Sequence, residues 1–211
     1  NSVDPARDIE IINMELIFAD MGQVERRLER ARKDARTKKE AQVEVAALER
    51  ILPLLEEGKP ARAAELSDDE EAVIKHLGLL SRKPIIYAAN VSEEDLATGN
   101  KFVDQVRAIA EKEGAKCVII SAQVEAELTE LAEEDRAEFL ESLGVKEGGL
   151  QSLVKATYDL LGLQTYFTTG PKETRAWTIH RGDTAPQAAG VIHTDFERGF
   201  IRAETVSFKD L

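Results

Sequence analysis

The sequence predicts a mixed α/β protein with a parallel sheet, an inserted antiparallel helical hairpin and a small α+β domain. Two apolar runs, residues 84–89 and 117–120, each end in polar residues, with a helix-length segment between them. This order is typical of a parallel strand–helix–strand unit. Heptad spacing in residues 24–35 and 41–55 indicates two helices that pack along each other. From residue 165 onwards, β-branched and aromatic residues become frequent, which indicates short strands.

The helical hairpin is expected to follow a helix that starts at Asp4-Pro5, an N-cap residue followed by proline at the first helical position. A polar break at residues 36–39 separates the two arms. Pro53 should kink or end the second arm, and the glycine and proline of residues 58–60 should break it.

A further helix should follow the hairpin. Ser67 and Glu70 have the spacing of a capping box, which predicts a helix through about Leu80. The helix between the two predicted strands should end at Gly114.

The composition allows a substantial core and disfavours sequence-specific DNA binding. Of the 211 residues, 43% are hydrophobic, and 40 acidic residues against 28 basic ones give a net charge of -12. An excess of acid repels DNA over most of the surface but leaves room for a local basic patch. Cys117 is the one cysteine, so no internal disulfide can form, and we expect a reducing cytoplasm. No apolar run reaches the roughly 18 residues of a membrane span, and no membrane association is expected.

The tip of the predicted hairpin is locally basic. Residues 26–39 contain eight basic residues and two acidic ones, a local excess of six positive charges. The basic residues are Arg26, Arg27, Arg30, Arg32, Lys33, Arg36, Lys38 and Lys39. Such a cluster is either a solvated helix tip or a surface that contacts the phosphate backbone of RNA.

Polar residues at the ends of the two predicted strands form a candidate site for a purine base. In open α/β sheets, ligands bind at the carboxyl ends of the strands. The Asn90 amide offers a donor and an acceptor to a purine, Glu93 could accept from base N–H groups, and Ser121-Ala122 could close the other side. The alternative is structural, with Asn90 capping the turn and Ser92 capping the next helix.

The phosphate half of a nucleotide site is missing from the sequence. No G-x-x-x-x-G-K-[ST] motif occurs, so the chain lacks the loop that cradles phosphates and the hydroxyl that binds Mg²⁺. No catalytic residues and no metal site are predicted, because His76, His180 and His193 are scattered along the chain. The acidic residues between 125 and 141 are expected to form the solvated face of a helical region.

The last part of the chain is expected to be a separate small domain. A helix over residues 150–161 should end at Gly162, and strands are predicted at residues 166–168, 176–179 and 200–206. A short helix is expected to start near Thr184.

Several of these stretches resemble the YchF/Obg-like ATPase family of translation-factor-related P-loop NTPases. Residues 3–13 resemble the helix entry after that family's third nucleotide motif, and residues 56–62 resemble the exit from its coiled-coil insertion. Residues 90–93 are similar to its N-x-x-E motif. Residues 166–179 and 185–196 resemble its TGS domain, which has a β-grasp-like fold.

The resemblance implies an ATP-preferring hydrolase that acts with the ribosome or RNA. Asn90 and Val91 would contact the purine, and Ser121, Ala122 and Gln123 would match the second base-contacting loop. Glu93 would replace the aspartate that pairs with guanine, which makes adenine acceptable, although GTP stays possible. Mg²⁺ would accompany the nucleotide in the intact protein.

The resemblance also implies a division into domains. Residues 1–20 and 81–163 would form a partial P-loop nucleotide-binding domain, residues 21–80 the coiled-coil hairpin, and residues 164–211 an incomplete TGS domain. We expect a chain truncated at both ends, with the phosphate loop and the Mg²⁺ ligands upstream, and therefore inactive by itself. Two other functions stay open, a non-enzymatic module that binds RNA or the ribosome, and a coiled-coil interaction scaffold.

Overall fold

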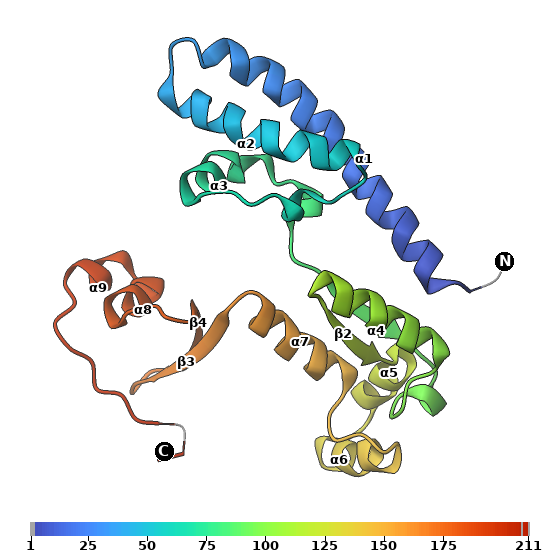
Figure 1. Cartoon of the computed structure of the whole chain (residues 1–211). Helices are drawn as coiled ribbons and strands as arrows, with labels where there is room; N and C mark the ends of the chain where they lie inside the picture. The colour runs from blue at the N-terminus through green and yellow to red at the C-terminus, as the bar shows by residue number, and fades with distance from the viewer. Residues whose placement is uncertain (1–2, 208, 211) are drawn as a thin grey trace. The chain divides into compact units, whose positions relative to one another are not determined.

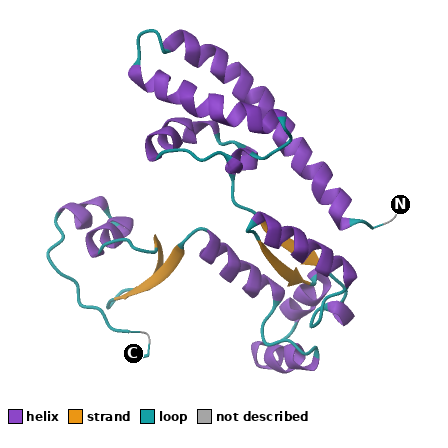
Figure 2. Cartoon of the chain, viewed as in Figure 1, coloured by secondary structure: helices purple, strands orange, loops and turns teal. Residues whose placement is uncertain are grey.

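The computed structural model describes residues 3–207 and 209–210 and has a mixed α/β fold with many helices and two small sheets (Figures 1 and 2). The residues group into two compact units, Asn1–Val145 and Lys146–Leu211. The second unit therefore includes the helix before residue 164, where the sequence placed the start of the last domain.

Helix α1 (Pro5–Asp34) starts as predicted. The Asp4 side chain accepts a hydrogen bond from the N–H of Arg7 at 3.2 Å, and Pro5 occupies the first turn, where its missing N–H costs nothing. Thirty residues give a helix of about 45 Å at the usual rise of 1.5 Å per residue. Its first half packs against α4 (Lys101–Glu113), and its second half packs along α2 (Figure 1).

Helix α2 (Lys39–Glu56) runs back along α1 after a short turn, so the predicted antiparallel pair is present. The two helices bury their heptad positions against each other. Val24 and Leu28 of α1 and Leu48 and Ile51 of α2 are at most 3% exposed. This seam forms most of the larger hydrophobic core, and its burial is the main force that holds the pair together.

Of the two outcomes expected at Pro53, a kink or a helix end, the helix end is wrong, because α2 continues to Glu56. Pro53 lies in the last turn of the helix, where its missing N–H removes a single hydrogen bond. Leu55 lies beyond it, is 1% exposed and packs in the core, which favours the continued helix. The chain leaves the helix at Gly58, whose φ of +73° is readily adopted by glycine.

The segment after α2 returns to α1 through the short 3-10 helices η1 (Ala61–Ala63) and η3 (Leu80–Arg82). The Asp20 side chain, 1% exposed, receives hydrogen bonds from the N–H of Leu80 at 2.8 Å and from the N–H and hydroxyl of Ser81 at 2.7 and 2.6 Å. The Ser81 hydroxyl oxygen accepts a further bond from the N–H of Ala61 at 2.9 Å. A buried carboxylate thus fixes the returning segment to the middle of α1.

Helix α3 (Asp68–Ile74) starts with the predicted capping box between Ser67 and Glu70. Its predicted length through Leu80 is wrong. The chain tightens into the 3-10 helix η2 (Lys75–Leu77) and then turns at Gly78, whose φ is +59°. A residue in the left-handed region cannot continue a right-handed helix.

The predicted strand–helix–strand unit is confirmed. Strands β1 (Ile86–Asn90) and β2 (Lys116–Ile120) pair in parallel, with Asn90 opposite Ile120. Helix α4 connects them. Asn100 caps its start by accepting hydrogen bonds from two backbone N–H groups, and Gly114 ends it at a φ of +65°.

The acidic region after β2 forms two helices, α5 (Ala122–Glu130) and α6 (Glu133–Ser142). Val124 and Leu128 of α5 pack with Leu96 in a small second core. The acidic side chains are exposed or half-buried, in keeping with a solvated face.

The second unit contains helix α7 (Gly149–Leu160) and the antiparallel strands β3 (Leu163–Thr169) and β4 (Thr174–His180). Gly162 adopts a φ of +62° between α7 and β3, where the helix was expected to end.

Two short helices, α8 (Ala185–Ile192) and α9 (Thr194–Arg198), follow β4. The Tyr166 hydroxyl donates to the carbonyl oxygen of Ala188 at 2.9 Å, which ties α8 to β3. The strand predicted at residues 200–206 is wrong, since these residues have no regular secondary structure. An alternating sequence becomes a strand only where another strand completes its hydrogen bonds.

Candidate functional site

The candidate site lies where β1 and β2 end. Because the strands are parallel and Asn90 pairs with Ile120, the loops that follow them emerge at the same edge of the sheet. The N–H of Val91 donates to the carbonyl oxygen of Ile120 at 2.9 Å and extends the pairing by one step. The structure therefore brings together the two loops that the sequence predicted as a base-binding pair.

One hydrogen bond joins these loops directly. The Oδ1 atom of Asn90 accepts from the backbone N–H of Ala122 at 3.0 Å. A backbone N–H can only donate, so the amide oxygen must face Ala122 and the NH₂ group must point elsewhere. Asn90 can thus donate to an acceptor such as purine N7, whereas we had expected it to use both ends of its amide on the base.

The first loop carries three consecutive acidic residues, and the structure distinguishes them. Asp95 is held, because its Oδ2 atom accepts from Nδ2 of Asn100 at 2.6 Å. Glu93 and Glu94 are exposed, and neither side chain has a hydrogen bond or ion pair among residues 3–207 and 209–210. Of the loop's carboxylates, these two are accessible to a base, and Glu93 is the one the sequence singled out.

The second loop is fixed by a helix cap. Ser121 is 1% exposed, and its hydroxyl oxygen accepts from the N–H of Val124 at 3.5 Å at the start of α5. The side chain of Gln123 donates to Glu127 at 3.1 Å. Ser121 and Gln123 therefore use their side chains within the protein, while Ala122 is exposed beside Asn90.

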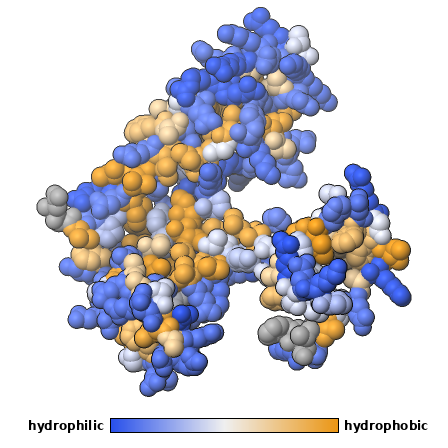
Figure 3. Space-filling view, turned by 180° about the vertical axis from the view of Figure 1, so that it is seen from behind, coloured by the Kyte–Doolittle hydropathy of each residue, from blue (hydrophilic) through white to orange (hydrophobic). Residues whose placement is uncertain are grey.

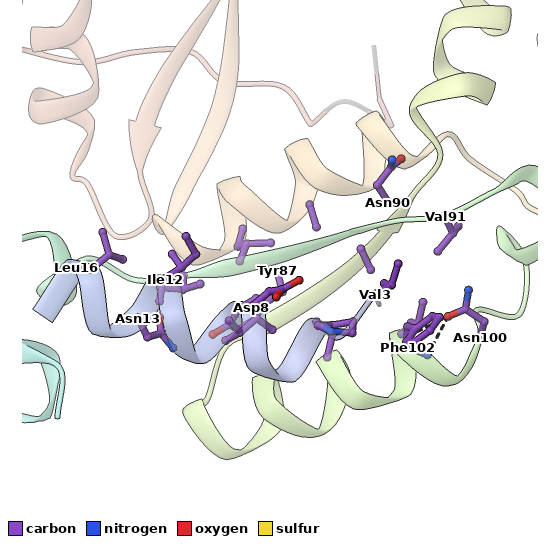
Figure 4. Close-up of a pocket in the computed structure, with 18 residues that line it drawn as sticks. Val3, Asp8, Ile12, Asn13, Leu16, Tyr87, Asn90, Val91, Asn100 and Phe102 are labelled. Carbon is purple, nitrogen blue, oxygen red and sulfur yellow. Dashed lines mark hydrogen bonds between the residues drawn. The ribbon is translucent and has the colours of Figure 1, made fainter. Parts of the chain in front are cut away.

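A cavity of about 580 Å³ runs along β1 between α1 and α4 (Figure 4). Leu16 and Asn90 lie toward opposite ends of it. Most of its lining is apolar, as with Ile12 and Phe102, and no lysine or arginine lines it among the residues described. The cavity therefore lacks the cations that hold phosphate groups.

The basic cluster divides into paired and unpaired side chains. Arg27 forms two hydrogen bonds of 2.6 Å with the buried carboxylate of Glu44, and Arg32 pairs with Glu49 at 2.8 Å. The other members are exposed and form no ion pair within the described parts of the chain; they are Arg26, Arg30, Lys33, Arg36, Lys38 and Lys39. The end of the helical pair is hydrophilic over the face seen at the top of Figure 3.

The hydrogen bonding of Arg27 to the Glu44 carboxylate is the main reason that the pKa of Arg27 is raised. Arg27 is thus a charged part of the packing between α1 and α2. The six unpaired cations form what we call the basic tip.

Residues 3–207 and 209–210 contain neither a metal-binding cluster nor a membrane-spanning helix. No group of three or more His, Cys, Asp or Glu side chains is placed to hold a metal ion. No helix there combines the length and apolar character needed to cross a bilayer.

The sequence analysis missed two residues, Asn100, which caps α4 beside the first loop, and Asp20, which fixes the returning segment to α1. Asn100 carried a usable signal, because asparagine just before a helical pattern is a strong N-cap. Asp20 carried a weaker one, since it lies three residues after Ile17 and four before Val24, on the buried stripe of α1.

Known proteins resemble the chain over nearly its whole length. The ribosome-binding ATPase YchF of Bacillus subtilis (strain 168) is 50% identical over 212 residues, which cover 99% of this chain and 58% of that protein. The chain is homologous to the YchF proteins. The resemblance predicted from the sequence is thereby confirmed.

Other comparisons agree with this homology. The ribosome-binding ATPase YchF of Escherichia coli O157:H7 is 53% identical over 209 residues, which cover 99% of this chain and 57% of that protein. A YchF GTPase structure from Schizosaccharomyces pombe superposes with a TM-score of 0.83 at 38% identity, covering 95% of this chain and 56% of that one. A family model named YchF-GTPase_C, whose description is "Protein of unknown function (DUF933)", matches residues 163–211. The chain thus spans somewhat over half the length of its YchF relatives.

Proposed function

We propose that this chain supplies the base-binding wall of a purine-nucleotide site in an ATPase that works with the ribosome. The observation that carries the proposal is the hydrogen bond between Asn90 and Ala122, which holds two loops side by side at the carboxyl end of the sheet. Nucleotides bind at this position in open α/β folds. The printed names of the relatives, ribosome-binding ATPase, agree with the proposal.

The adenine preference is assigned to Glu93. Asn90 offers an NH₂ donor, and N7 is an acceptor in both purines, so Asn90 does not distinguish them. Guanine, unlike adenine, presents N–H groups at its N1 and N2 positions, which an acceptor must satisfy. An exposed glutamate with a longer side chain than aspartate places its carboxylate differently, so guanine loses a specific partner and ATP is favoured.

The remaining parts of the proposed site lie outside this chain. The phosphate-binding loop, the Mg²⁺ ligands and the catalytic groups would come from a preceding segment of the intact protein. In this proposal residues 1–20 and 81–163 complete a P-loop nucleotide-binding domain, residues 21–80 form the coiled-coil hairpin and residues 164–211 belong to a TGS domain. We expect the 211-residue chain by itself to be inactive.

The test is the nucleotide preference of the intact protein, which matters because the relatives' names include both ATPase and GTPase. We expect ATP to bind more tightly than GTP, and Glu93→Asp to shift the affinity ratio toward GTP by roughly tenfold or more. Glu94→Asp, one residue further along the same loop, is the matched control. A clear preference of the wild-type protein for GTP would contradict the proposal that the site prefers adenine.

A second candidate function is supported by the basic tip. Its six exposed cations lie on a protein with a net charge of -12, an arrangement that suits the phosphate backbone of ribosomal RNA. This function does not need the nucleotide site, so it also covers the non-enzymatic alternative.

The chain itself can test the RNA proposal. We expect it to bind structured RNA with an affinity that falls as salt rises, and to lose that binding when Arg30, Lys33 and Arg36 are changed to glutamate. Reversing three exposed charges away from the tip, Lys112, Lys116 and Lys155, gives a comparison variant of equal net charge. RNA binding that changes neither with the salt concentration nor on reversal of the tip charges would favour a protein-interaction scaffold instead.

A further inference from the structure

One carboxylate receives hydrogen bonds from three other elements of the first unit. Glu113, near the end of α4, accepts from the Tyr87 hydroxyl of β1 at 2.7 Å. It also accepts from the Arg62 guanidinium of η1 at 3.3 Å and from the Asn13 amide of α1 at 3.4 Å. These partners are 26, 51 and 100 residues away in the sequence.

Two segments connect the pair of helices α1 and α2 to the rest of the first unit, and each contributes one residue to this cluster. Asn13 lies in the first half of α1, whose second half packs with α2. Arg62 lies in the returning segment and also donates to the carbonyl oxygen of Ser81 at 3.2 Å. Tyr87 and Glu113 belong to the strand–helix–strand unit. The cluster therefore joins the base of the helical pair to the sheet.

This contact differs in character from the one at Asp20. Asp20 is 1% exposed and holds the returning segment to α1 within the helical part. The side chains of Glu113 and Arg62 are 26% and 23% exposed, so water can replace their mutual contact. Nearby, the first half of α1 leaves Ile11 and Ile12 about half exposed, at 49% and 55%. Of the apolar residues in this half of α1, Ile17 and Met14 pack in the larger core, and the polar cluster adds a second attachment.

The Tyr87 hydroxyl stays protonated and donates its hydrogen bond to Glu113. Burial raises the pKa of its hydroxyl, and the hydrogen bond to Glu113 raises it further, so the group keeps its proton near neutral pH. Its role is to position Glu113 relative to β1.

We propose that Glu113 is the joint that couples the helical pair to strand β1. When the joint is intact, α1 docks along β1 and α4. When it is broken, the first half of α1 loosens while α2 stays packed on the second half. Asn90 lies three residues beyond Tyr87 on β1, so the joint would also link the helical pair to the base-binding loops. That last consequence rests on the proposed function, whereas the joint itself does not.

Hydrogen–deuterium exchange of the 211-residue chain tests the proposal without any ligand. Glu113→Gln should raise the exchange rate of residues 9–16 and 86–90 on the order of tenfold, because bonds to a charged acceptor are lost. Residues 41–55 should exchange as in the wild type. Glu111→Gln, at an exposed position of the same helix, should leave all three segments unchanged.

A double variant separates the joint from general destabilisation. If Tyr87 acts through Glu113, Tyr87→Phe should add little to the exchange of residues 9–16 once Glu113→Gln is present. Unchanged exchange of residues 9–16 in Glu113→Gln overturns the proposal. So does an equal rise in all three segments, because that would mean global unfolding. Neither result depends on nucleotide or RNA binding, so a failure of the proposed function would be recognised separately.

Discussion

The side-chain oxygen of Asn90 accepts a hydrogen bond from the backbone N–H of Ala122, 32 residues further along the chain. This bond fixes the distance between two loops and the direction of the Asn90 amide. In Asn90→Ala the Ala122 N–H has no side-chain acceptor, so its hydrogen exchange should accelerate on the order of tenfold, as measured by NMR. Glu94→Ala is the control at an exposed position of the same loop. Equal exchange of the Ala122 amide in wild type and Asn90→Ala would show that the bond does not persist in solution.

Asn90→Ala also makes a prediction for the intact protein. Since purine N7 is common to adenine and guanine, affinity for ATP and GTP should fall by a similar factor, roughly tenfold. A loss confined to one nucleotide, measured by titration, would mean that Asn90 contacts a group other than N7.

Asp20→Asn should lower the free energy of unfolding by about 1–3 kcal/mol, because one acceptor of a buried site is replaced by an NH₂ group facing other donors. Urea unfolding followed by circular dichroism measures the change. Glu25→Gln, at an exposed position of α1, is the matched control and should have an effect within about 0.5 kcal/mol of zero. Equal stability of the two variants would contradict a role for Asp20 in fixing the returning segment.

Two glycines of the helical pair should respond to alanine in opposite directions. Gly22 lies inside α1, and an added Cβ would lie 3.4 Å from the flexible end of Arg26, so Gly22→Ala should stabilise by about 0.5–1 kcal/mol. At Gly58 an added Cβ would lie in ordinary contact with the Met14 side chain, 3.6 Å from its sulfur, but the φ of +73° strains any other residue, so Gly58→Ala should destabilise by about 1–2 kcal/mol. Thermal unfolding of the two variants measures both changes. A destabilised Gly22→Ala would indicate that α1 bends at this position.

The capping box of α3 should make the free energy of unfolding depend on pH in the acid range. The backbone N–H of Ser67 donates to the Glu70 carboxylate, and this bond lowers the pKa of Glu70 below its ordinary value of 4.5. A carboxyl whose pKa is lower in the folded chain stabilises folding when ionised. The stabilisation is therefore complete above pH 4.5 and disappears as the pH falls through the lower, folded pKa.

The measurement compares melting temperatures of the wild type and Glu70→Gln from neutral pH down to about pH 3. Below pH 4.5, the melting temperature of the wild type should fall further than that of the variant. Parallel curves for the two proteins would mean that Glu70 ionises alike in the folded and unfolded states.

The predictions of helix ends that succeeded depend on interactions over a few residues. Asp4 caps α1, Ser67 and Glu70 form their box, and Gly114 ends α4, all as expected. The same local reasoning missed Gly78, which stops the third helix before Leu80. The strand expected at residues 200–206 failed because its hydrogen bonds would have to come from another strand.

The candidate site was predicted in part. Its two loops follow from the pattern of apolar runs ending in polar residues, and the structure brings them together. The sequence did not predict which side-chain atoms of the loops remain accessible to a ligand. Asp95 is bound by Asn100 and Ser121 by the start of α5, through contacts over five and three residues that the sequence analysis missed. Arg27 pairs with Glu44 of the neighbouring helix, and this pairing depends on how α1 and α2 pack.

By itself, the sequence determined most of the helices and several of their caps, the heptad seam, the parallel strand–helix–strand unit and the basic character of residues 26–39. These features follow from periodicity and from contacts within about four residues, which every part of the chain carries locally. The tertiary structure decided that Asp20 clamps Ser81, 61 residues away, and that Glu113 gathers partners from three elements. Such pairings arise when hydrophobic burial brings distant segments together, and polar groups trapped there must then find partners.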